Sequence, residues 1–148
     1  MALTSLLTPL ALATSAAFAG AAAYINLSEQ PARLSLDDVS LLREWKPSYA
    51  RGFEMQATLA LVSGLLGLAA FYFENHPAAA LGGVLMLANW PYTLWVMAPN
   101  NKALAATPDQ DAGPTTRARI VRWGKLHAVR TGLGIAGAGA FVVASFLT

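Results

Sequence analysis

The chain has 148 residues, of which 55% are hydrophobic and only 12% are charged, and it contains no cysteine. Average soluble domains carry roughly 25% charged residues, so this composition favours a single domain whose main solvent is lipid. The lack of cysteine excludes a disulfide, a thiolate nucleophile and a Cys-ligated metal, and a formal charge of only +2 argues against a nucleic-acid partner.

The first apolar segment runs from about residue 3 to 27 and holds no charged side chain. It is longer than the roughly 20 residues that a helix needs to cross a bilayer. Although its alanine-rich end resembles a signal-peptide cleavage site, no Lys or Arg precedes the apolar run. We therefore expect this segment to be retained as a membrane span.

Three more apolar segments follow, at about residues 53–73, 78–98 and 126–147. The second and third are separated only by residues 74–77, a turn so short that the two spans must be antiparallel neighbours. The sequence thus predicts an all-α fold, an integral membrane four-helix antiparallel bundle. One domain covers 1–148, with long connections at 28–52 and 99–125.

All ten basic residues lie in or beside those two connections: Arg33, Arg43, Lys46, Arg51, Lys102, Arg117, Arg119, Arg122, Lys125 and Arg130. By the positive-inside rule, the two connections are cytoplasmic and both termini are non-cytoplasmic. A bacterial inner membrane is the expected location. Most of the arginines in the third connection are expected to anchor the chain on anionic lipid headgroups.

The first connection has its own predicted structure. Ser35 and Asp38 form a capping box before the apolar positions of residues 36–45, which predicts a short amphipathic helix on the membrane surface. Pro47 is expected to open the helix that continues into the second span.

In the third span Asn89 lies near the bilayer centre, and Pro91 follows two residues later. Proline leaves the carbonyl of Leu87 without its helical donor, so a kink is expected. Helical spacing places a polar stripe on one face: Asn89, Tyr92 or Thr93, Val96 and Asn100. Hydrogen bonding between helices and a site role both explain such a stripe.

The other spans add polar residues that lipid disfavours. His127 and Arg130 share a face of the fourth span, Gln56 lies on a small, polar face of the second, and Asn26, Glu29 or Gln30, and Arg33 share a face of the first. An apolar cavity with a few convergent polar groups is typical of a small-molecule site. The predicted site residues are Asn26, Glu29, Gln56, Asn89, Tyr92, Asn100, His127 and Arg130.

Four stretches carry a family resemblance: residues 24–34, 55–57, 89–93 with 99–101, and 123–130. Together, over nearly the whole chain, they resemble the anthrone-oxygenase-like membrane proteins, whose bacterial members are mostly a domain of unknown function. The resemblance implies a four-helix membrane protein. In some fungal members the implied activity is oxidation of polycyclic anthrones to anthraquinones without an obvious organic cofactor, with dioxygen as co-substrate. A hydrophobic small molecule and the lipid bilayer are the implied partners.

Chemistry assigns hypothetical roles within that activity. His127 is the candidate base that removes a proton from the activated methylene, and Arg130 stabilises the developing phenolate or enolate. Gln56, Asn89 and Tyr92 would orient the substrate oxygens.

Other functions remain open at this point. Asn26-x-x-Glu29-x-Pro31 resembles an element of the trimeric membrane glutathione-transferase and eicosanoid family, although the arginine expected before it is missing. A metal or haem site would draw on His127, Glu29 and Glu54, but no metal site is predicted from a lone intramembrane histidine.

A non-enzymatic scaffold or accessory subunit would use the polar residues only to hold the bundle together. Direct hydrogen bonds with no cavity between them would favour the scaffold, whereas a pocket would favour a ligand. A homo-oligomer is compatible with each of these functions.

Overall fold

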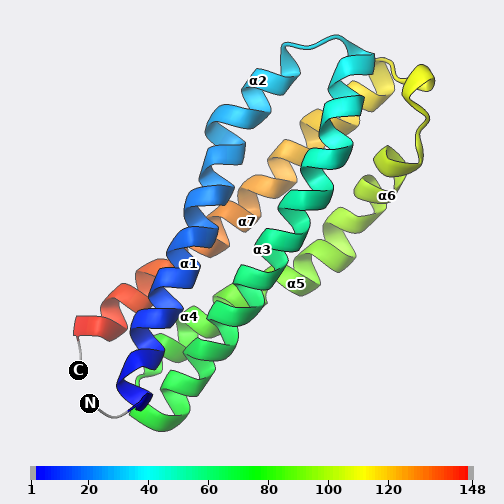
Figure 1. Cartoon of the computed structure of the whole chain (residues 1–148). Helices are drawn as coiled ribbons and strands as arrows, with labels where there is room; N and C mark the ends of the chain where they lie inside the picture. The colour runs from blue at the N-terminus through cyan, green and yellow to red at the C-terminus, as the bar shows by residue number, and fades with distance from the viewer. Residues whose placement is uncertain (1–2, 147–148) are drawn as a thin grey trace.

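The computed structural model describes residues 3–146, which form four long helical segments in an antiparallel bundle (Figure 1). The first segment consists of η1 (Leu3–Leu6), α1 (Leu7–Tyr24), the π-helical turn η2 (Ile25–Glu29) and α2 (Gln30–Leu34). The second segment is α3 (Asp38–Glu74). The third consists of α4 (Pro77–Leu87), α5 (Asn89–Tyr92), the π-helical turn η3 (Thr93–Met97) and α6 (Ala98–Ala106). The short turn η4 (Asp109–Asp111) leads to the fourth, α7 (Pro114–Phe146). The predicted all-α four-helix bundle is confirmed.

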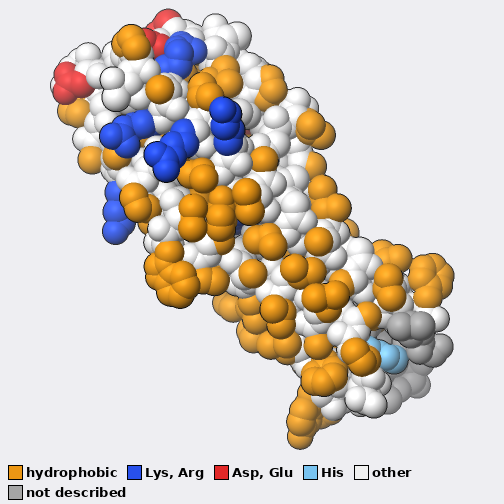
Figure 2. Space-filling view, turned by 180° about the vertical axis from the view of Figure 1, so that it is seen from behind, with side chains coloured by type: hydrophobic (Ala, Val, Ile, Leu, Met, Phe, Trp, Pro, Cys, Tyr) orange, Lys and Arg blue, Asp and Glu red, His pale blue; other side chains and the backbone are white. Residues whose placement is uncertain are grey.

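The helices follow one another around the bundle in the order α1, α3, α4 and α7, so that α1 and α4 each pack against both α3 and α7. The tight turn at residues 74–77 lies at the same end as the termini (Figure 1), and we call this the turn end. Asn75 closes α3 there in the left-handed conformation, with φ of 56°. The opposite end carries connections 28–52 and 99–125 and most of the Lys and Arg side chains (Figure 2), and we call it the basic end.

Among the described residues, three helices are long and apolar enough to cross a membrane: Leu7–Leu34, Asp38–Glu74 and Pro114–Phe146. Their most apolar windows have mean hydropathies of 1.5, 1.6 and 1.5. On the face shown in Figure 2, the coloured side chains between the two ends are mainly apolar, and the charged ones gather toward one end. These features are those of a membrane protein.

Small residues build the core of the turn end, where α3 and α4 make a very close contact. A Cβ added at Gly83 would lie 2.9 Å from the backbone oxygen of Gly64, and one added at Gly67 would lie 2.6 Å from the ring of Phe141. We call the following buried set the turn-end core: Ala11, Phe18, Ala22, Ala60, Ala70, Ala79, Met86, Phe141 and Ala144. Such packing is what holds helices together where lipid removes the hydrophobic driving force.

Larger side chains fill the core of the basic end. Trp45 stacks on Tyr49 with ring centroids 4.8 Å apart and meets the edge of Trp123 at 6.0 Å. We call the following buried set the basic-end core: Leu41, Leu42, Trp45, Met97, Leu104, Ile120 and Trp123. The four helical segments therefore extend as a packed bundle beyond the predicted spans.

The start of the second segment differs from the prediction. The N-cap of α3 is Asp37, whose Oδ1 accepts hydrogen bonds from the backbone N–H groups of Val39 and Ser40 at 3.1 and 3.0 Å. These bonds, the one from Ser40 first, lower the pKa of the Asp37 carboxyl. The capping box predicted at Ser35 was wrong, because Ser35 instead donates to the carbonyl of Ala32.

The predicted surface helix is not a separate element, since residues 38–46 form the first turns of α3. Its apolar face, with Leu42 and Trp45, is buried in the basic-end core instead of lying in lipid headgroups. Pro47 consequently lies inside α3 and does not open a new helix.

The helix of the third segment is interrupted close to Pro91, where a kink was predicted, since α4 ends at Leu87 and α5 begins at Asn89. The π-helical turn η3 then changes the helix register. Asn89, Thr93 and Asn100 are buried as predicted, but Val96 is 46% exposed while its neighbour Met97 is buried. The expected place of Val96 on the polar stripe was therefore wrong.

Charged side chains tie the connections of the basic end together. Lys46 Nζ donates to Asp109 Oδ1 and to the carbonyl of Thr107, both at 2.7 Å, which joins α3 to η4. The hydrogen bond from Lys46 is the main cause that lowers the pKa of the Asp109 carboxyl. Arg117 donates to Asp38 and to the carbonyl of Leu34, so this arginine links three segments.

Candidate functional site

The first segment, α3 and α7 meet around His127, near the start of the predicted fourth span. A close approach of α7 to the first segment makes this possible. Gly124 leaves room for Gln30, whose Nε2 would lie 2.8 Å from an added Cβ and donates to the carbonyl of Ile120 at 2.9 Å. A larger residue at position 124 would displace the Gln30 side chain.

Asn26 orients the His127 imidazole. The Asn26 Nδ2 donates to the Gly124 carbonyl at 2.9 Å, which directs Oδ1 toward the ring, 2.8 Å from His127 Nδ1. Thr131 Oγ1 donates to the same oxygen at 2.7 Å. Because Oδ1 only accepts hydrogen bonds, this arrangement assigns the proton to Nδ1 and leaves a lone pair on Nε2.

Gln56 faces that lone pair from α3. Its Oε1 lies 3.4 Å from His127 Nε2, while its own Nε2 is buried and has no hydrogen-bond partner among the described residues. The oxygen and nitrogen of an amide are exchanged by a rotation of its terminal bond, and that exchange would direct an N–H group at the imidazole. Gln56 can therefore accept a hydrogen bond from protonated His127 or donate one to the neutral ring.

Trp123 holds the imidazole from one side. The two rings stack at 28° with centroids 4.9 Å apart, and His127 is 1% exposed. The guanidinium of Arg33 lies 5.4 Å from the centre of the Trp123 ring. The imidazole is thus fixed both by a hydrogen bond and by stacking.

Arg130 brings a cation next to the histidine. It is 5% exposed, its guanidinium lies 5.6 Å from the centre of the Phe18 ring, and it forms no ion pair with any described residue. Its Nε has no hydrogen-bond partner in the described part of the chain. A buried cation of this kind is suited to stabilise negative charge on a bound molecule.

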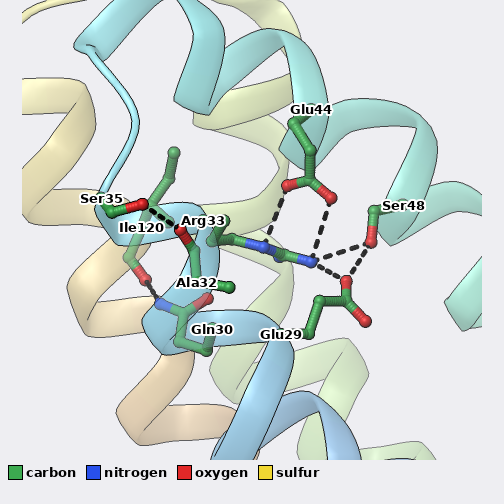
Figure 3. Close-up of polar contacts among 8 residues, drawn as sticks. All are labelled: Glu29, Gln30, Ala32, Arg33, Ser35, Glu44, Ser48 and Ile120. Carbon is green, nitrogen blue, oxygen red and sulfur yellow. Dashed lines mark hydrogen bonds and ion pairs between the residues drawn. The ribbon is translucent and has the colours of Figure 1, made fainter.

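His127, Arg130 and Gln56 line a small cavity of about 20 Å³. Glu29 also lines it, and its Oε1 accepts hydrogen bonds from Arg33 and Ser48 (Figure 3). Asn26 borders this region through its bond to His127. Five of the eight predicted site residues are therefore brought together here.

The other three predicted residues lie further along α5 and α6. Asn89, with Arg130, lines a second cavity of about 10 Å³, and its Nδ2 donates to the carbonyls of Leu85 and Met86 in its own segment. Tyr92 donates its hydroxyl proton to the carbonyl of Leu126 at 3.0 Å. Asn100 donates to the carbonyl of Arg119 at 3.1 Å and lines neither cavity.

Four contributors were not predicted from the sequence. Trp123 and Thr131 lie four residues before and after His127, so helical spacing on α7 was a signal that could have found them. Ser48 and Glu44 contact the buried guanidinium of Arg33, with Glu44 Oε2 lying 3.0 Å from Arg33 Nε (Figure 3). Glu44 lies in the helix that was expected on the membrane surface, and Ser48 lies in the helix expected to begin at Pro47; no sequence signal directed either side chain inward.

The ligand set considered for a metal or haem is not assembled. Within residues 3–146, no three or more His, Cys, Asp or Glu side chains form a group that could hold a metal ion. Glu54 is exposed, whereas His127 is buried in the bundle.

Comparison with known proteins adds to this geometry. The family described as Anthrone oxygenase matches residues 45–140 of the chain. The chain belongs to the anthrone oxygenase family. The matched range includes Gln56, Asn89, His127 and Arg130, while Asn26 and the rest of the first segment precede it.

Two curated anthrone oxygenases from fungi are similar to this family member. The Anthrone oxygenase of Claviceps purpurea (strain 20.1) is 29% identical over 114 residues, which cover 69% of this chain and 66% of the fungal protein. The chain thus spans slightly less than two thirds of that relative. Anthrone oxygenase ptaC of Pestalotiopsis fici is 30% identical over 109 residues, 64% of this chain and 77% of the relative. No solved structure matches this anthrone oxygenase family member.

Proposed function

We propose that the protein oxidises the methylene group of a hydrophobic, phenolic polycyclic molecule of the anthrone type with dioxygen, in a pocket within the membrane bundle. The observation that carries the proposal is the hydrogen bond between half-buried Asn26 and buried His127. It leaves the lone pair of Nε2 facing a cavity that Arg130 also lines. A base beside a fixed cation suits a reaction that begins by creating a carbanion.

The first step is proton transfer. His127 Nε2 takes one proton from the methylene carbon, whose acidity comes from the adjacent aromatic rings and the conjugated ketone. The electron pair of the broken C–H bond moves into the rings and onto the ketone oxygen as an enolate. Arg130 stabilises that negative charge, and Gln56 accepts a hydrogen bond from the protonated imidazole.

Dioxygen is the oxidant in the second step. The carbanion passes two electrons to dioxygen and forms a C–O bond, and the proton held by His127 completes a hydroperoxide. Loss of the remaining C–H proton forms the C=O bond, breaks the O–O bond and releases water. In total, the methylene group and one dioxygen give one carbonyl group and one water.

Two unbonded groups support a ligand site over a purely structural bundle. Gln56 Nε2 and Arg130 Nε are buried without hydrogen-bond partners among the described residues, and both side chains line the cavity. Buried polar groups are normally paired, so groups left open at a cavity are available to a bound molecule.

Oxygen uptake by the purified protein with a panel of anthrones tests the proposal, measured above the protein-free rate. His127→Ala should lower kcat at least about 10²-fold, the smallest usual effect of a general base. The matched control is His76→Ala at the turn end, which should retain the wild-type rate. An unchanged rate in His127→Ala would exclude this histidine as the base, and no uptake with any anthrone would contradict the proposed reaction.

We further propose that the basic end faces the cytoplasm of a bacterial inner membrane, with both termini on the other side. The distribution of all ten Lys and Arg residues supports this orientation. Because the chain has no cysteine, Asn75→Cys and Asp111→Cys provide single labelling positions at opposite ends. A membrane-impermeant maleimide added to intact cells should label position 75 and not position 111, and the reverse pattern would overturn the orientation.

A further inference from the structure

The cavity beside His127 is too small for the proposed substrate. Its volume of about 20 Å³ leaves room for about one water molecule. Pockets for drug-sized molecules measure roughly 300–1,000 Å³. A polycyclic ligand must therefore occupy a larger space that opens onto this cavity.

A groove of about 620 Å³ lies next to the cavity, between the first segment and the basic-end half of α3. It is lined by Ala21, Tyr24, Ile25, Glu29, Glu44, Pro47, Ser48, Arg51, Gly52 and Met55. It is open to the outside of the bundle, and the exposed side chains of Tyr24 and Met55 belong to segments predicted as membrane spans. A hydrophobic molecule dissolved in the bilayer could enter it sideways.

The groove and the cavity share one wall. Four residues line both spaces: Ile25, Glu29, Ser48 and Gly52. Glycine is the smallest of these, and a Cβ added at Gly52 would meet no other atom within 4 Å. Gly52 therefore leaves an unfilled gap in the wall, one helical turn before Gln56, which contacts His127.

The surface of the groove is mostly apolar, and it holds two carboxylates, of which Glu44 is paired with Arg33. Glu29 Oε1 accepts the hydrogen bonds from Arg33 and Ser48, and Oε2 carries no hydrogen bond with a described residue (Figure 3). The Glu29 side chain remains 25% exposed. Ala21, Ile25 and Met55 supply apolar contacts. This combination fits a flat aromatic molecule with a hydroxyl group.

We propose that this groove is the substrate site and that substrate reaches His127 Nε2 through the gap at Gly52. A phenolic hydroxyl of the substrate donates a hydrogen bond to Glu29 Oε2, which makes Glu29 a specificity-determining residue. The identity of the ligand rests on the proposed function, whereas the groove and its gap are inferred from the four residues that line both spaces.

Gly52→Leu tests the gap, because an added Cβ meets nothing within 4 Å there and the larger side chain would occupy the open space. It should lower kcat/KM for 1,8-dihydroxyanthrone at least tenfold, with an unchanged melting temperature in detergent. Gly52→Ala should have a smaller effect in the same direction. The matched control is Gly132→Leu, also a helical glycine with nothing within 4 Å of an added Cβ, which should behave as wild type.

Glu29→Gln tests the hydroxyl contact, since it keeps an oxygen for Arg33 and Ser48 but places N–H donors where Oε2 lies. We expect a severalfold loss of the preference for 1,8-dihydroxyanthrone over unsubstituted anthrone. An unchanged preference would remove Glu29 from substrate recognition.

Binding of 1,8-dihydroxyanthraquinone, followed by absorbance or fluorescence, separates this inference from the proposed reaction because it requires no turnover. Binding that is lost in Gly52→Leu but kept in Gly132→Leu supports the groove even if no anthrone is oxidised. Equal binding and equal turnover in wild type and Gly52→Leu would overturn the groove while leaving the oxygenase proposal standing. A wild-type protein that binds no anthraquinone would overturn the groove as a site for this ligand class.

Discussion

The two ends of the bundle differ in how completely their buried polar atoms are hydrogen-bonded, since Glu74 Oε1 is the one such atom without a partner among the described residues of the turn end. Around the turn-end core, the buried hydroxyls donate hydrogen bonds: Thr8 to Glu74, Ser15 to the Leu12 carbonyl and Ser63 to the Leu59 carbonyl. Toward the basic end, buried amide and guanidinium groups retain atoms without partners among the described residues, as in Gln56, Asn89 and Arg130.

Packing follows the same division. Glycines bring α3 and α4 into direct backbone contact at the turn end, whereas the cavities and the groove described above lie toward the basic end. Close packing and satisfied hydroxyls stabilise one half, which allows the other half to keep open space and unpaired polar groups. This is the usual compromise between stability and a functional site.

The largest effect is expected from a substitution that disrupts the close packing of the turn end. Gly83→Val should cost about 3 kcal/mol of unfolding free energy, the upper end of overpacking penalties, because even its Cβ would lie 2.9 Å from the Gly64 oxygen and 3.1 Å from the Leu68 nitrogen. Unfolding in mixed detergent and SDS measures the loss. The control is Gly139→Val, where an added Cβ meets nothing within 4 Å. Equal losses of unfolding free energy in both variants would contradict the close packing of α3 and α4 at the turn end.

A smaller effect is expected at the border of the two halves, where Asn26 orients His127. Asn26→Leu removes the acceptor for Nδ1–H and should lower kcat about 10²-fold, as expected for a misplaced catalytic group. Asn26→Asp keeps an oxygen toward the imidazole and should restore most of the rate. Steady-state oxygen uptake is the measurement, and equal rates in the two variants would show that Asn26 does not act through the histidine.

The smallest effect is expected from the contact between Asp109 and Lys46 on the surface of the basic end. The pKa of Asp109 is lowered in the folded protein, so its contact with Lys46 contributes stability above the ordinary carboxyl pKa, and this contribution is lost as pH falls through the folded value. Asp109→Asn should therefore melt slightly below wild type at neutral pH. The difference should vanish in strong acid, and a difference that persists there would assign it to another cause.

Part of this fold can be predicted from the sequence, and part of it cannot. The four helices, the turn at residues 74–77 and the burial of Gln56, Asn89 and His127 follow from apolar length and misplaced polar residues. Local patterns do not determine tertiary partners. The apolar face of residues 38–46 fits a membrane surface and a protein core equally well, and the core contains it here.

Register was the other source of error. The π-helical turn η3 adds a residue to one turn, so regular helical spacing misplaced Val96 while it placed Asn89 and Asn100 correctly. The grouping of Arg33 with Glu44 and Ser48 depends on how the first segment meets α3, which no spacing within either segment reveals.

The other π-helical turn, η2, sets the length of chain between Asn26 and Arg33. Asn26 forms hydrogen bonds with α7, whereas Arg33 forms an ion pair with α3. Removing one residue from this turn would rotate everything after it by roughly 100°, given 3.6 residues per helical turn. Arg33 would turn away from Glu44 while Asn26 stayed beside His127. A deletion in this stretch would therefore break the Arg33 contacts without removing any of the side chains that make them.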